Sequence, residues 1–115
     1  MKVGVLFRDE TAWLIQRALA ALFRVNVPAI TKHLKNIFES GELDRAATVS
    51  KMAMVQSEGG RDVLREVTLY NLDAIIAVGY LHDSPNAVVY IVAVWDAPKT
   101  GVPVLIDPRR RTPPQ

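Results

Sequence analysis

The sequence has no cysteine, which excludes disulfide bonds and thiolate metal sites and is compatible with a reducing compartment. Its two histidines, His33 and His82, are poor material for a metal site without a cluster of carboxylates near them. No apolar run approaches the roughly 20 residues of a membrane-spanning helix. The acidic pair Asp9-Glu10 comes too early to leave room for the apolar region of a signal peptide. We therefore expect a cytoplasmic protein with no membrane segment and no bound metal.

Recognisable catalytic groups are absent as well. The sequence contains no pair of nucleophile and base at a useful spacing, so we expect neither an enzyme nor a cofactor. Asp73 has no partner carboxylate or histidine, and a place near the positive end of a helix explains it better. The two glycines of "SEGGRD" predict a hairpin turn, because a phosphate-binding loop also needs a Lys-Ser/Thr pair and a following helix.

Acidic residues are missing from the long stretch between Glu10 and Glu39. That stretch carries four basic residues: Arg17, Arg24, Lys32 and Lys35. A locally basic element in a chain whose net charge is only +2 is typical of a phosphate-binding surface. Lysines that solvate the outer faces of helices give the same pattern, so charge alone leaves both interpretations open.

The 115 residues are 50% apolar and 23% charged, as expected for one globular domain. Residues 3–7 and 11–14 are short apolar runs around a polar turn, and they predict a small β-hairpin. The segment "IQRALAALF" is rich in helix formers and predicts a helix that ends at Phe23. After the interruption "RVN", Asn26 caps a second helix, Val27–Phe38, which stops at Ser40-Gly41.

The hydrophobic period changes from helical to alternating after Leu43. Both "TVSKMAMVQ" and "VLREVTLY" alternate, and the Gly-Gly turn between them predicts a β-hairpin over Val49–Tyr70. Asn71 caps a short helix that is predicted to finish at Gly79. Residues 81–115 are expected to form an irregular tail. Within it, "AVVYIVAVW" is strand-prone, and the proline-rich end with Arg109, Arg110 and Arg111 is expected to be disordered.

Helix, three-residue turn and helix together predict a helix-turn-helix, in which the second helix lies in the DNA major groove. Ala20 falls where the two helices approach closely, and Phe23, Val25 and Ile30 fall where the motif needs apolar contacts. Arg24 begins the turn, where glycine is usual because φ tends to be positive, and we expect modest strain there. The following β-hairpin occupies the position of a wing. The predicted fold is therefore an α+β winged helix-turn-helix domain closed by a capping helix.

Two longer stretches resemble a known family. The segment "WLIQRALAALFRVNVPAITKHLKNIFESGELDR", followed by "VSKMAMVQSEGGRDVLREVTLYNLDAIIAVGY", is similar to the N-terminal domain of the RhuM virulence-protein family. The resemblance covers about two thirds of the chain, and its most specific pieces are "ITKHLKNIF", "GELD" and "YNLDAIIAVGY". It implies a winged helix-turn-helix-like domain of bacterial proteins, often encoded in mobile regions. That domain is presumed to bind double-stranded DNA and has no established enzymatic activity.

The resemblance stops abruptly after "VGY". There the family continues with a basic "RV-N-S" stretch and a long amphipathic helix around "FRIWAT". This chain reads "LHDSPNAVVYIVAVWDAPKTGVPVLIDPRRRTPPQ" instead. The motif HxFxxGN of the Fic/Doc-type domain found in some relatives is also absent. We expect a truncated or frameshifted family member with a family domain at 1–80 and a divergent tail at 81–115. Translation of the coding DNA in its other two frames tests this.

The candidate DNA-contacting residues are Arg17, Asn26, Thr31, Lys32, His33, Lys35, Lys51 and Arg61. Lysines act mainly as phosphate point charges, whereas Thr31 can reach a base edge or a thymine methyl group. Trp13 is expected to pack in the core beneath the helices. Two alternatives stay open. One is an ordinary solvated helix face, and the other is a protein-interaction module of a toxin-like or mobile-element system without DNA affinity. A homodimer or another partner protein is compatible with either.

Overall fold

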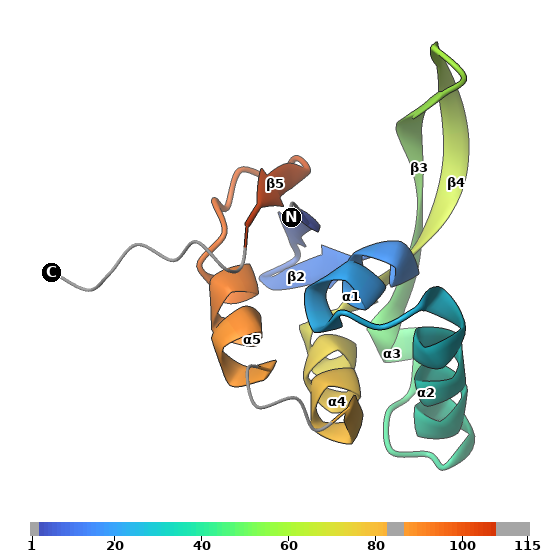
Figure 1. Cartoon of the computed structure of the whole chain (residues 1–115), viewed down its shortest axis with the longest axis vertical. Helices are drawn as coiled ribbons and strands as arrows, with labels where there is room; N and C mark the ends of the chain where they lie inside the picture. Colours follow the sequence, from blue (N-terminus) through green and yellow to red (C-terminus); the bar gives the residue numbers. More distant parts are fainter. Residues whose placement is uncertain (1–2, 83–86, 108–115) are drawn as a thin grey trace, which may run out of the picture.

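A computed structural model describes residues 3–82 and 87–107 of the chain (Figure 1). The elements, in chain order, are β1 (Val3–Arg8), β2 (Thr11–Leu14), α1 (Gln16–Phe23), α2 (Val27–Glu39), α3 (Arg45–Thr48), β3 (Val49–Glu58), β4 (Arg61–Asn71), α4 (Leu72–His82), α5 (Ala87–Trp95) and β5 (Val104–Ile106). Over the described residues they form an α+β domain with a five-stranded antiparallel sheet and five helices.

The sheet has the strand order β3-β4-β2-β1-β5. The central strand β2 is short, with four residues, and it pairs with β4 only at Trp13↔Asn71 and Leu14↔Tyr70. The hairpin of β3 and β4 is much longer, because its pairing runs from Val49↔Tyr70 to Glu58↔Arg61. Most of this hairpin therefore extends beyond the other strands and stands away from the body of the molecule (Figure 1).

The main core lies between one face of the sheet and the helices α1, α2, α4 and α5. Its largest fully buried side chains are Val3, Val5, Leu14, Leu19, Leu22, Ile30, Ile37, Ile75, Val78 and Val94. The opposite face of the sheet carries a smaller cluster of Leu6, Trp13 and Leu69. The expectation that Trp13 packs beneath the helices is wrong, because successive residues of β2 point to opposite faces and its neighbours Ala12 and Leu14 take the helix side.

The N-terminal hairpin and the segment of α1, turn and α2 follow the sequence prediction closely. Register pairs Leu6↔Trp13 to Arg8↔Thr11 join β1 to β2. Arg24 ends α1 in the left-handed conformation, with φ 58° and ψ 45°, as expected for a position where glycine is usual. Ala20, Phe23 and Ile30 are all buried in the main core.

The predicted finish of α4 at Gly79 is wrong, because the helix continues to His82. Gly79 is buried inside α4. A Cβ atom at this position would lie 2.9 Å from Cζ of Phe23 in α1 and 3.2 Å from Cδ1 of Ile91 in α5. The glycine therefore marks a close approach between three helices and not a helix end.

The irregular tail expected after residue 80 is also wrong for the described part, because residues 87–107 supply α5 and β5. The segment "AVVYIVAVW" is helical, although it was predicted to be strand-prone. Val94 of α5 is fully buried in the main core, and β5 pairs with β1 through Val3↔Ile106, Gly4↔Leu105 and Val5↔Val104. Arg109, Arg110 and Arg111 lie outside the described residues.

Candidate nucleic-acid interface

The orientation of α2 is set by its cap and by its apolar side. The side-chain oxygen of Asn26 accepts a hydrogen bond from the backbone N–H of Ala29 at 2.8 Å, and a proline in the first turn needs no such partner. Ile30, Leu34 and Ile37 are buried at helical spacing against the core. The cap and the buried stripe together leave the opposite side of α2 turned to solvent.

Lys32 and Lys35 lie on that exposed side of α2. Lys32 makes no ion pair with any residue that the structure describes. Nζ of Lys35 is 4.0 Å from Oε1 of Glu39, and these side chains are 68% and 66% exposed. An exposed pair of this kind contributes at most about 1 kcal/mol, so a stronger anionic partner can displace Glu39. We call Lys32 and Lys35 the cationic ridge of α2.

Thr31 lies on one flank of α2 and is tied to the core. Its hydroxyl group is 2.7 Å from Oε1 of Gln16 and 3.1 Å from the carbonyl oxygen of Val27. Nε2 of Gln16 in turn donates to the hydroxyl oxygen of Tyr70 at 2.8 Å. This relay links α2, α1 and β4. The hydroxyl proton of Thr31 is therefore used inside the protein, which leaves the methyl group and an oxygen lone pair for an outside partner.

His33 and Thr31 lie on different sides of α2. Two residues along an α-helix correspond to a rotation of about 200°, so His33 falls on the other flank of α2. Its side chain is half-buried there. Of the predicted residues on α2, the ridge lysines and Thr31 share one side, and the histidine occupies the boundary opposite.

A groove of about 460 Å³ runs between α2, α3 and the base of β4. Its lining combines the Thr31–Gln16–Tyr70 relay with Lys35 and a basic residue that the sequence interpretation did not select, Arg45. The guanidinium carbon of Arg45 lies 5.2 Å from the ring centroid of Phe38, a cation–π distance. Arg45 directly follows the acidic segment "ESGELD", so the local net charge in the sequence is negative and gave no sign of a basic site. In the fold it extends the cationic ridge from α2 to α3.

The β3–β4 hairpin has no net charge. Between Val49 and Asn71 it carries three basic and three acidic residues. Nζ of Lys51 lies 3.9 Å from Oε1 of Glu66. Nε and Nη2 of Arg65 donate to the two carboxylate oxygens of Glu58 at 2.9 and 3.1 Å. These hydrogen bonds raise the pKa of Arg65, so this guanidinium stays charged throughout the range in which proteins are usually handled.

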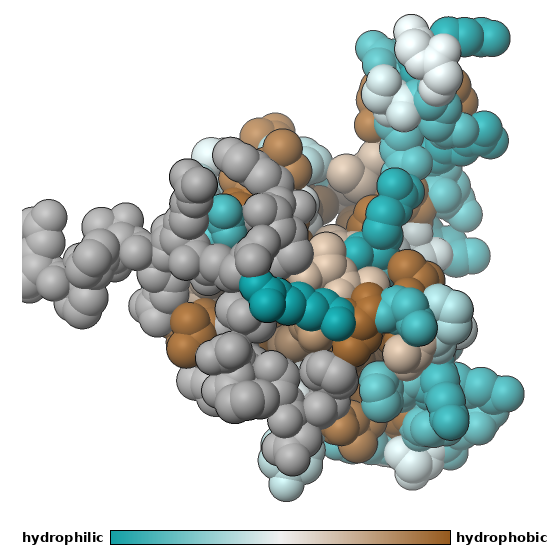
Figure 2. Space-filling model, in the orientation of Figure 1, coloured by the Kyte–Doolittle hydropathy of each residue, from teal (hydrophilic) through white to brown (hydrophobic). Residues whose placement is uncertain are grey.

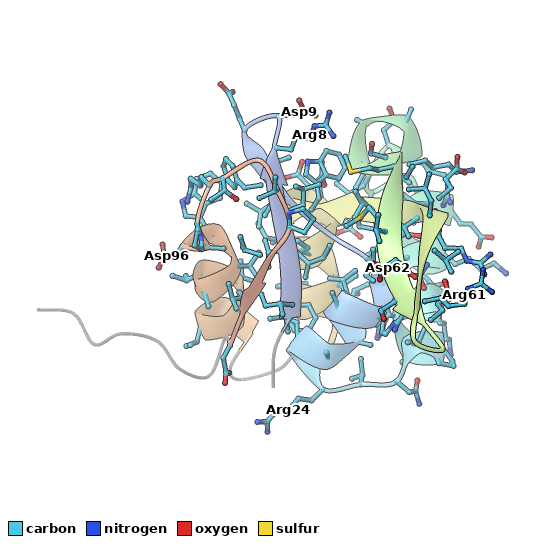
Figure 3. All side chains as sticks on the ribbon, turned by 90° about the horizontal axis from the view of Figure 1, so that it is seen from above. Arg8, Asp9, Arg24, Arg61, Asp62 and Asp96 are labelled. Carbon is cyan, nitrogen blue, oxygen red and sulfur yellow. The ribbon has the colours of Figure 1, made fainter. Side chains whose placement is uncertain are left out.

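Lys51 and Arg61 do not form one cluster. Lys51 pairs with Thr68 near the base of the hairpin, and Arg61 pairs with Glu58 at its tip. By this register the two side chains lie on opposite faces of the ribbon and, at about 3.3 Å per residue, roughly 20 Å apart. Lys51 shares the face of Tyr70, which lines the groove, whereas Arg61 points outward at the tip (Figure 3).

Arg17 and Arg24 are separated from the cationic ridge of α2. Arg17 is exposed on α1 and lines a cleft of about 690 Å³ between α1 and the β3–β4 hairpin. Arg24 projects away from the body of the molecule (Figure 3). Hydrophilic side chains gather along the outer side of the hairpin and around α2 (Figure 2). The structure therefore brings Lys35 and Arg45 to one groove, with Lys32 on the same exposed side of α2. Lys51 shares only the sheet face of Tyr70, and Arg17, Arg24 and Arg61 lie apart.

Among the described residues, no three His, Cys, Asp or Glu side chains come close enough to hold a metal ion. None of the helices within 3–82 and 87–107 is long and apolar enough to span a bilayer. No protein-family model, curated protein or solved structure matches the chain.

Proposed function

We propose that this protein is a winged helix-turn-helix domain that binds double-stranded DNA, with α2 (Val27–Glu39) in the major groove. The observation that carries the proposal is the cationic ridge. Lys32 and Lys35 stand on the exposed side of a capped helix, opposite the buried Ile30, Leu34 and Ile37. The short turn after α1, with Arg24 in the left-handed conformation, agrees with the turn of a helix-turn-helix, in which the second helix enters the groove.

In this arrangement the lysines and Arg45 contact phosphates and hold the register of the domain on the duplex. Thr31 presents its methyl group, which suits the C5-methyl group of thymine. Lys51, at the base of the wing, lies on the face of the sheet that also lines the groove beside α2. The tip of the wing contributes little, because Arg65 is paired with Glu58 and the hairpin has no net charge.

The resemblance of residues 3–80 to the RhuM family supports the same proposal, since the N-terminal domain of that family is presumed to bind DNA. Membership of that family is part of the proposal. The order of elements agrees with a winged helix-turn-helix: α1 and α2 are followed by the β3–β4 hairpin and by α4. The short α3 between α2 and the hairpin carries the additional cation Arg45.

Two double variants of equal charge test the proposal. Each Lys→Glu or Arg→Glu change alters the charge by −2, so Lys32→Glu/Lys35→Glu and Arg17→Glu/Arg24→Glu both take the net charge from +2 to −2. Fluorescence anisotropy with a labelled duplex should show an affinity loss of at least roughly 100-fold for the lysine variant, because two phosphate contacts become repulsions. The arginine variant should lose no more than roughly threefold, through long-range charge alone.

Urea unfolding of both variants serves as the control for folding, since all four side chains are exposed. Equal losses in the two variants would show that binding follows net charge and not the ridge. Full affinity of the folded lysine variant would refute the proposed mode of binding.

A further inference from the structure

The central strand β2 has four residues and is shorter than β1, with six, and β4, with eleven. β1 and β4 lie on either side of β2, but β2 pairs with β1 only from Leu6 to Arg8 and with β4 only at Tyr70 and Asn71. After Leu14 the chain leaves the sheet and enters α1. In the described part of the chain, no strand therefore fills the space between the first half of β1 and the free edge of β4.

Two hollows lie beside this space, between the start of β1, α1 and side chains of both hairpin strands. The larger, of about 690 Å³, is bounded by the start of β1, by α1 and by the upper part of the hairpin. The smaller, of about 110 Å³, lies deeper, beside Trp13, Met54 and Leu69. Both are lined by Gly4, Ile15 and Ala18, so the two hollows adjoin, and we call them together the slot. The notch between the hairpin and the rest of the molecule is visible in Figure 2.

β1 and β4 run in the same direction, which allows one added strand to be antiparallel to both. β1 and β4 are each antiparallel to β2 and hence parallel to one another. A segment that continues the line of β2 is antiparallel to both neighbours and can exchange backbone hydrogen bonds along its two edges. Unpaired strand edges are ready templates for such pairing, and addition of an extended peptide to a sheet is a common mode of recognition.

The lining defines the chemistry of the added segment. On the side of α1 the slot is lined by Ile15, Ala18 and Ala21, which leave room for small apolar side chains. On the other side, Trp13, Met54 and Leu69 offer an apolar hollow for larger ones. Two arginines, Arg17 and Arg65, also line the slot.

The two arginines differ in whether their guanidinium group already has an acidic partner. Arg65 is held by the carboxylate of Glu58, whereas Arg17 has no ion pair among the described residues. An acidic side chain on the incoming segment complements Arg17.

We propose that the slot between β1 and β4 binds an extended, apolar segment of a partner protein that places one acidic side chain against Arg17. The end of this chain is a poor occupant, because "PRRRTPPQ" holds three prolines, which lack the backbone N–H, and three arginines, which repel Arg17. The proposal is independent of DNA binding, which uses the side of α2 that carries Lys32 and Lys35.

The test starts from displayed eight-residue peptides with free sequence, flanked by glycine-serine linkers and selected on the immobilised full chain. The expected winners alternate small and large apolar residues and contain one Asp or Glu. Capped synthetic copies should bind in the micromolar range by calorimetry. A selection without enriched peptides, or with winners that lack this pattern, would overturn the proposal.

Three variants locate the binding. Ala21→Trp fills the slot and should weaken the best peptide at least tenfold, whereas Ala46→Trp on exposed α3 should leave its affinity within twofold. Arg17→Glu should reverse the charge preference, so that a lysine version of the peptide binds at least tenfold better than the acidic original. Peptides that bind Ala21→Trp as well as the unchanged chain occupy another surface and refute the site.

N-methylation of the peptide distinguishes insertion from simple edge addition. An inserted strand has neighbours on both edges, so methylation of either of two successive backbone N–H groups should weaken binding at least tenfold. Sensitivity at every second residue only would show pairing with one edge, and the proposed insertion would be wrong. If the unchanged chain is a dimer by sedimentation and Ala21→Trp is a monomer, a second copy fills the slot and the partner proposal falls.

Discussion

A methyl group added at Gly79 tests how the three helices around it pack. In an exposed helix, Gly→Ala stabilises a protein by about 1 kcal/mol, because alanine has the higher helix propensity. At this position the new Cβ would lie 2.9 and 3.0 Å from Cζ and Cε1 of Phe23 and 3.2 Å from Cδ1 of Ile91. The ring of Phe23 is only 2% exposed and has little room to move. Overpacking of a dense core costs about 1–3 kcal/mol.

The overpacking is therefore larger than the gain in propensity, and Gly79→Ala should lower the free energy of unfolding by about 1 kcal/mol. Urea unfolding followed by tryptophan fluorescence measures this change. Phe23→Leu removes the two ring atoms nearest to the new methyl group. In that background the same glycine change should become neutral or stabilising, with a coupling of about 1–2 kcal/mol. Stabilisation of the unchanged chain by about 1 kcal/mol would refute the packing of α4 against α1 and α5.

Three further substitutions test local features of the fold by the same unfolding measurement. Asn26→Ala removes the cap of α2 and should cost about 1 kcal/mol, whereas Asn26→Asp keeps an oxygen acceptor and should cost much less. Arg24→Gly removes the strain of a left-handed residue at φ 58° and should raise the free energy of unfolding by about 0.5 kcal/mol, after the entropy of glycine is included. Arg24→Val should lower the free energy of unfolding clearly. A valine variant more stable than the glycine variant would contradict the assigned turn. Lys99→Met removes the hydrogen bond from Nζ to the carbonyl oxygen of Trp95 and the cation–π contacts with the rings of Phe7 and Trp95. It should lower the free energy of unfolding by about 1–2 kcal/mol. No change would show that these contacts at the end of α5 do not stabilise the fold.

The first two thirds of the fold could be predicted because local signals agreed there. Asn26 and Gly41 mark the ends of α2, and two glycines mark the turn of the hairpin. Apolar spacing changes from the helical period to alternation where the structure changes from α2 to β3. Arg24 was predicted to be strained from its position alone, and its positive φ confirms this.

The C-terminal part could not be predicted in the same way. "AVVYIVAVW" is a short, uninterrupted apolar run, and such a run has no period to separate a buried helix from a strand. Its β-branched residues favoured a strand, but packing against α4 and the core decides for a helix. Gly79 was misinterpreted for a similar reason, because the residue that requires a glycine there, Phe23, is 56 positions away in the sequence.

The candidate site shows the same limit. Lys32 and Lys35 were predicted to be exposed because helical spacing fixes which side of α2 they occupy. Which side chains of different elements lie together depends on the strand register and the tertiary contacts, and neither can be derived from the spacing of residues in the sequence. The pairing of β3 with β4 separates Lys51 from Arg61, and the contact with Phe38 brings Arg45 to the groove.

The salt dependence of duplex binding tests the central claim most directly. If Lys32, Lys35, Arg45 and Lys51 each neutralise one phosphate, the slope of log affinity against log salt should be about −3.6. Anisotropy titrations should then show a loss of roughly 100-fold between 50 and 200 mM salt. An affinity that changes less than about threefold over this range, or no binding at the lower salt concentration, would contradict a groove-bound cationic helix.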